Sequence, residues 1–148
     1  MYSIELKYFK LSAVYCLILG AISALISLIP FFMPVISLLF IPFLGVIIPF
    51  ILLIKKDGFY TDENKAYAIL GAFGGFCLCI SYLIVFSPLV LLIHLVNKNY
   101  YAYGIQFLHP FLAVLFFVMI AVVYSSANSV VGLIIGFIYK YLKGKTNA

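Results

Sequence analysis

Residues 11–54 read LSAVYCLILGAISALISLIPFFMPVISLLFIPFLGVIIPFILLI, a run of 44 residues without a single charged side chain. As one helix this run would be about 66 Å long, more than twice the ~30 Å hydrocarbon thickness of a bilayer. It therefore predicts two membrane spans with a tight turn between them. Pro30 and Pro34 mark the turn, because a proline cannot continue a helix from the turn before it. We expect the two spans over about 10–29 and 33–54.

The composition of the whole chain favours a membrane domain as well. Of the 148 residues, 67% are apolar and 9% are charged, whereas soluble domains are about half apolar and a quarter charged. Two further apolar regions follow, over about 66–96 and 105–139. A polar loop over 55–65 and a short aromatic connection over 97–104 separate the spans. The sequence thus predicts an all-α fold, a polytopic transmembrane helical bundle that forms a single transmembrane domain over 1–148.

The region 105–139 allows two interpretations, one long helix or two spans that turn near residues 125–129. Lysine distribution decides between them, since lysines concentrate on the cytoplasmic side of membrane proteins. With four spans and both termini cytoplasmic, eight of the nine lysines lie inside and only Lys98 lies outside. The eight are Lys7, Lys10, Lys55, Lys56, Lys65, Lys140, Lys143 and Lys145. With five spans the division is five against four. We therefore predict four spans, with a cytoplasmic loop at 55–65 and an outer loop at 97–104.

The prolines and the first residues add two expectations. Pro42 and Pro49 lie inside the second span and should kink it. The apolar run that starts at Leu11 continues without a polar cleavage region, so we expect an uncleaved first span. Lysine as the only cation, with abundant Ile, Phe, Tyr and Asn, suggests an AT-rich bacterial genome, and we expect the protein in the inner membrane.

Three spans carry stripes of small residues, the feature that lets membrane helices approach closely. The candidate packing residues are Gly20, Ala24, Gly71, Gly75, Asn128, Gly132 and Gly136. They could join two copies of the chain, or another membrane protein, or they could pack the helices of one chain. We favour the last, because one small bundle needs several such stripes. The second span has no such stripe, so we expect it to face lipid. The serines near Asn128 are expected to bond to neighbouring helices or to their own backbone.

Few residues suggest chemistry. His94 and His109 fall near the outer ends of the third and fourth spans and are the weak candidates for a ligand site. Two histidines without a nearby carboxylate or thiol make a poor metal site, so no metal is expected. The cysteines lie inside apolar runs without a CxxC spacing, and dispersed lysines without arginine argue against nucleic acid.

The functional prediction is correspondingly coarse. No carboxylate lies in the middle of a span, and no nucleophile or cofactor motif occurs, so we predict no enzymatic activity and no cofactor. The leading hypothesis is a small multi-pass accessory or interaction subunit, with the lipid bilayer and another membrane protein as partners. The alternative is an oligomeric permease or channel for ions or small solutes. A lipid-modifying enzyme would have only His94 and the loop acids Asp57, Asp62 and Glu63 to work with.

Overall fold

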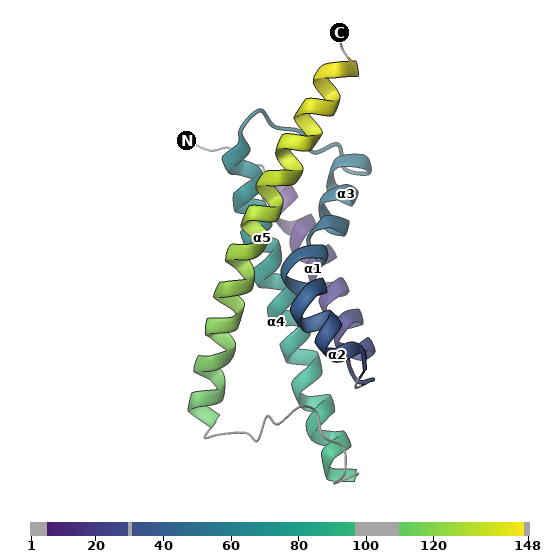
Figure 1. Ribbon diagram of the computed structural model, residues 1–148, viewed down its shortest axis with the longest axis vertical. Helices are drawn as coiled ribbons and strands as arrows, with labels where there is room; N and C mark the ends of the chain where they lie inside the picture. The colour runs from purple at the N-terminus through teal and green to yellow at the C-terminus, as the bar shows by residue number, and fades with distance from the viewer. Residues whose placement is uncertain (1–5, 30, 97–109, 147–148) are drawn as a thin grey trace.

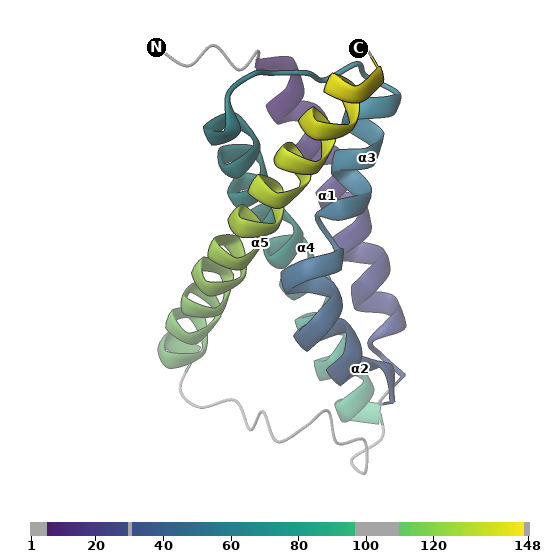
Figure 2. The same cartoon turned by 45° about the horizontal axis from the view of Figure 1, so that its top comes forward.

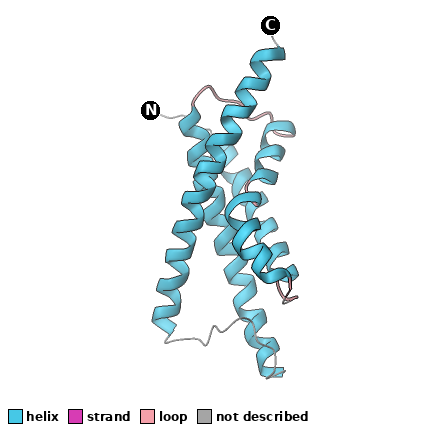
Figure 3. Ribbon diagram, in the orientation of Figure 1, coloured by secondary structure: helices cyan, strands magenta, loops and turns pink. Residues whose placement is uncertain are grey.

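The computed structural model describes residues 6–29, 31–96 and 110–146, and over these residues every regular element is a helix (Figure 3). The elements are α1 (Leu6–Ile26), α2 (Phe32–Val35), η1 (Ile36–Leu44), α3 (Ile47–Lys55), α4 (Asn64–Val96) and α5 (Pro110–Thr146). The short elements α2, η1 and α3 follow one another along a single path. They form the second span.

Within the described residues, four stretches are long and apolar enough to cross a membrane: Leu6–Ile26, Phe32–Lys55, Asn64–Val90 and Val118–Leu142. The all-α class and the number of candidate spans are therefore confirmed. The largest differences from the predicted bounds are at the start of the first helix and the end of the last. Helix α1 begins at Leu6 rather than near residue 10, and α5 continues to Thr146, past its predicted end near residue 139. The predicted outer loop and the first residues of the last predicted span lie outside the described residues.

Helix α4 is the centre of the bundle, with its most extensive contacts to α1 and α5 (Figures 1 and 2). The second span packs alongside them. Its side chains Ile41, Val46 and Phe50 are no more than 2% exposed. The opposite face stays exposed, with Leu38 and Leu39 each more than half exposed, so the expectation that this span faces lipid holds for one face and not for the other. The large side chains on its buried face fill the space between α1, α4 and α5. Small residues would leave that space empty.

The second span is interrupted near its middle. Its first part, η1, is a π-helix that contains Pro42, and the Gly45 N–H bonds to the Phe40 carbonyl, five residues back, at 2.6 Å. A turn at Gly45 and Val46 follows, and then α3 begins. Pro49 lies in the first turn of α3, where a missing N–H is tolerated. Pro42 thus accompanies the predicted distortion, whereas Pro49 lies beside a helix start.

Helix α5 runs without a break through residues 125–129, as the lysine distribution predicts. The polar side chains there bond as expected. Ser125 donates to the Ala72 carbonyl on α4 at 2.7 Å, and Ser126 donates to the Val122 carbonyl of its own helix at 2.9 Å. Because such bonds satisfy the hydroxyls within a continuous helix, a polar run of this kind need not mark a turn.

The start of α1, the connection between α3 and α4 and the end of α5 all lie at one end of the bundle (Figures 1 and 2). The end of α4 and the start of α5 lie at the other. Helix α5 extends farther than the other helices at the first end. At 37 residues it is about 55 Å long, well above the ~30 Å of a hydrocarbon core.

Candidate functional site

Helices α4 and α5 approach each other closely where they cross at Gly71 and Gly132. A Cβ atom added to Gly132 would lie 2.5 Å from the Tyr67 carbonyl oxygen and 3.2 Å from the Gly71 Cα. A Cβ added to Gly71 would lie 2.5 Å from the Asn128 carbonyl oxygen. These neighbours are backbone atoms, which cannot move aside as a flexible side chain can. Only glycine therefore fits on either side of this crossing.

Two further glycines of the same stripes make room for side chains. Gly75 faces Asn128, whose Cβ and Nδ2 would both lie 2.6 Å from an added Cβ. Gly136 faces the ring of Tyr67, with Cγ and Cδ2 both at 2.7 Å. The stripes on α4 and α5 thus meet each other within one chain. They enclose Asn128 and Tyr67, which are fully buried.

Asn128 connects this crossing to the interrupted second span. Its Nδ2 donates a hydrogen bond to the Ile41 carbonyl at 3.1 Å. In an α-helix that carbonyl would accept from the Gly45 N–H, which here bonds to Phe40 instead. The Asn128 amide thus supplies a donor where the π-helix has displaced the backbone one. Its Oδ1 atom is buried and has no hydrogen-bond partner among the described residues.

The crossing of α1 and α4 is built on Gly20. An added Cβ there would lie 2.5 Å from the Leu78 carbonyl oxygen and 2.9 Å from the Ser81 Cβ. The Ser81 hydroxyl donates to the Leu17 carbonyl across the same contact at 2.5 Å. Ala24 is fully buried one helical turn farther along α1. Small residues here bring two backbones together, and a hydroxyl then bonds across them.

Polar side chains gather where α3, α4, α1 and α5 meet the connection at 56–63. Tyr15 of α1 donates to the Asp57 carboxylate at 3.0 Å. Lys140 of α5 donates to the Asp62 backbone carbonyl and, at 3.0 Å, to the Asn64 side-chain oxygen. The connection is therefore bonded to the first helix and to the last one. These contacts fix one end of the bundle.

Tyr60 in this connection gives a prediction about pH. Its hydroxyl donates to the Asp62 carboxylate at 2.7 Å, and this bond is the main reason that the pKa of Tyr60 lies above its ordinary value. A raised pKa means that the bond stabilises the fold below pH ~10 and that this contribution disappears as the pH rises through the pKa of folded Tyr60. The Asp62→Asn variant should return the pKa of Tyr60 toward 10.

The measurement is a tyrosinate absorbance titration, with the Tyr60→Phe protein subtracted to isolate one of the 12 tyrosines. Asp57→Asn is the matched control, because Asp57 bonds to Tyr15 and not to Tyr60. If the titration midpoint of Tyr60 were unchanged in the Asp62→Asn variant, the Asp62 carboxylate would not be the cause of the raised pKa of Tyr60.

The sequence-based candidates for a ligand site fall largely outside the described structure. His109 lies outside the described residues, and His94 lies on α4 with a side chain that is not described. Among the described residues no group of three or more His, Cys, Asp or Glu side chains could hold a metal ion. Cys16 and Cys79 are buried, Cys77 is half-buried, and all three are free thiols.

Two sets of long-range hydrogen bonds could not be predicted from the sequence. The Asn128 to Ile41 bond joins residues 87 positions apart, and the Lys140 bonds span 76 and 78 positions. The sequence signals for the first contact were Asn128, an asparagine within an apolar helix, and Pro42, a proline in the middle of a span. These signals do not show that the two regions face each other, because that depends on how the helices are rotated about their axes.

The fold and its polar contacts define a small helical bundle with four helices able to cross a membrane. No protein-family model, no curated protein and no solved structure matches this chain.

Proposed function

We propose that this chain is a multi-pass inner-membrane protein without catalytic activity, and that it acts as an accessory or interaction subunit of another membrane protein. The observation that carries the proposal is the exposure of α5. Only 17% of the most apolar part of α5 is buried, against 50% of that part of α4. Helix α5 packs mainly on α4, which leaves most of its circumference free within the chain.

The exposed face of α5 supports a protein partner rather than a soluble ligand. Ile134, Phe137 and Ile138 are each more than half exposed and carry branched or aromatic side chains. Aromatic side chains such as that of Phe137 are enriched where proteins bind each other. The helix also extends past the others at the end that carries Lys140. A partner could therefore contact it both within the membrane and just outside.

Site-specific photocrosslinking in living cells tests this proposal. A photoreactive residue at Ile134 or Phe137 should give one discrete protein adduct, whereas the same residue at Ile18 or Leu25 on exposed α1 should give none. The adduct should be lost in a Phe137→Ala variant and recovered reciprocally from the partner. Adducts with lipid alone from all four positions would contradict a subunit role.

The proposed topology places both termini in the cytoplasm, and this gives a prediction. Lys7, Lys55 and Lys140 lie on elements that meet at one end of the bundle, which the lysine rule assigns to the cytoplasm. Fluorescent protein fused after Ala148 should fluoresce, and alkaline phosphatase at the same position should be inactive. Phosphatase fused after residue 100 is the control and should be active. Phosphatase activity at the C-terminus would overturn the four-span topology.

A second candidate function is a permease or channel, which the interrupted second span supports. Transporter sites often lie where a membrane helix is broken, because unwound backbone exposes polar groups there. Here the π-helix, Gly45 and the unpartnered Asn128 Oδ1 occur together in the bundle interior. Saturable flux of an ion or small solute into vesicles that contain the protein, reduced by Asn128→Ala, would support this function. Equal leakage with and without the protein across a broad panel would exclude it.

A further inference from the structure

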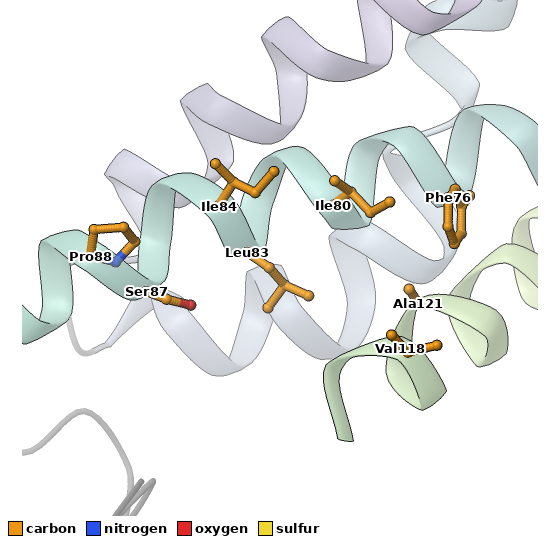
Figure 4. Close-up of a pocket in the computed structure, with 8 residues that line it drawn as sticks. All are labelled: Phe76, Ile80, Leu83, Ile84, Ser87, Pro88, Val118 and Ala121. Atoms are coloured by element: carbon orange, nitrogen blue, oxygen red, sulfur yellow. The ribbon is translucent and has the colours of Figure 1, made fainter. Parts of the chain in front are cut away.

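Helices α4 and α5 diverge in the half of the bundle that lies away from the 56–63 connection (Figure 1). An apolar groove of about 490 Å³ lies between them there (Figure 4). Its lining consists of Phe76, Ile80, Leu83, Ile84, Ser87 and Pro88 from α4 and Val118 and Ala121 from α5. Ile84 is 66% exposed and Val118 is 55% exposed. The groove is therefore open at the surface that faces the bilayer.

The chemistry of the lining selects a hydrocarbon ligand. Among the described residues that line the groove, every side chain except Ser87 is apolar and none carries a charge. A polar solute would lose its hydrogen bonds to water there without gaining replacements. An acyl chain has no such groups to satisfy. Ser87 lies at one end of the groove beside Pro88, whereas Phe76 and Ala121 lie at the other (Figure 4).

The length of the groove matches one leaflet. From Phe76 to Pro88 along α4 the rise is about 18 Å, and half of a ~30 Å hydrocarbon core is about 15 Å. Measured from Asn64, where α4 leaves the polar connection, Phe76 lies about 18 Å along the helix and Ser87 about 34 Å along it. Phe76 is therefore near the midplane of a ~30 Å hydrocarbon core, and Ser87 is near its far surface. A lipid of this leaflet would thus bring its ester groups to Ser87 and the end of its chain to Phe76.

The volume favours an acyl chain over a partner helix. A helix ~10 Å wide and 18 Å long occupies about 1,400 Å³, which is more space than the groove offers. A helix could therefore insert only a few side chains and would leave its backbone outside. A single hydrocarbon chain is thin enough to lie within the groove along its whole length.

We propose that the groove between α4 and α5 binds one acyl chain of a membrane lipid in the leaflet away from the 56–63 connection. The bound chain fills the space between the diverging helices. This lipid therefore does not exchange freely with the other lipids around the bundle. The proposal goes beyond a subunit or permease function and requires neither of them.

Photoactivatable phospholipids test the proposal. The full chain is reconstituted in phosphatidylcholine vesicles that contain a phosphatidylcholine with a diazirine either near the ester or at the chain end. The ester-proximal probe should label residues near Ser87, and the chain-end probe should label residues near Phe76 and Ala121. Peptide mapping by mass spectrometry reads the positions.

Val118→Phe fills the groove from its exposed rim and should abolish these adducts. Val123→Phe is the matched control, because Val123 lies on the same helix, is 62% exposed and does not line the groove. It should leave the adducts unchanged. Wild-type circular dichroism in both variants shows that the fold is retained.

Three results would overturn the proposal. One is labelling that is equal on all lipid-exposed faces, as for exchanging lipid. Another is labelling that Val118→Phe and Val123→Phe reduce to the same extent. The third is a protein–protein adduct between two copies through a photoreactive residue at position 118, which would show that a second copy occupies the groove.

Discussion

A Gly132→Ala variant should lose about 3 kcal/mol of unfolding free energy, an effect at the upper end of those seen when a packed core is overfilled. The added methyl group would lie 2.5 Å from the Tyr67 carbonyl oxygen and 3.2 Å from the Gly71 Cα. Both are backbone atoms of α4, so the two helices must separate to admit it. Reversible unfolding in mixed detergent micelles, followed by far-ultraviolet circular dichroism, measures the loss.

Gly74→Ala is the matched control for this prediction. An added Cβ there would meet only the Cys16 Sγ at 3.0 Å and the Ser12 Oγ at 3.2 Å, both ends of side chains. Those atoms can shift by a few tenths of an ångström, so the variant should stay within about 1 kcal/mol of the wild type. Equal losses in the two variants would show that the backbone approach at Gly132 does not limit the packing.

An Asn128→Ala variant should lose about 2 kcal/mol of unfolding free energy. The substitution removes the donor to the Ile41 carbonyl and leaves a buried acceptor in the interrupted second span. It also opens a cavity at a side chain that is fully buried. Interhelical hydrogen bonds in membranes contribute about 0.6–1.7 kcal/mol, and the cavity adds to that. The same detergent unfolding measures it.

Ser126→Ala is the control, because the Ser126 hydroxyl bonds to its own helix and the residue is exposed. That variant should change the unfolding free energy by less than about 0.5 kcal/mol. Hydrogen exchange gives a second measurement for Asn128→Ala. Amides of η1 around Ile41 should exchange faster, whereas those of α1 should not. Faster exchange throughout the bundle would mean that Asn128 acts on global stability and not on the second span.

The sequence predicted the helical class and the four candidate spans because both depend on local composition. An uncharged run longer than a bilayer has to turn, and residues 11–54 do turn after Ile26. The continuity of α5 through residues 125–129 was the less obvious result. Hydropathy alone allowed either one long helix or two spans. The division of lysines between the two sides of the membrane favoured one helix, because that count takes in all the loops of the chain.

The sequence did not predict how the second span packs or why it is broken. Its bulky side chains resemble those of a lipid-facing helix, since lipid and a protein interior are equally apolar. Only the arrangement of α1, α4 and α5 makes Val46 and Phe50 buried. The Ile41 carbonyl of the π-helix likewise accepts from the Asn128 side chain, which lies 87 residues away in the chain. Contacts of this kind depend on helix rotation, which periodicity in a uniformly apolar segment does not report.

The central position of α4 sets the order in which the protein can assemble during synthesis. Helix α1 and the second span are made first, yet α1 makes its main contacts with α4 and only limited ones with α3. At ~5–20 residues per second, the ribosome needs about 2–8 s to produce the chain from Lys55 to Val96. During that interval the first two spans form a hairpin in the membrane without their principal packing surface. Gly20 therefore reaches Leu78 only after α4 has been made.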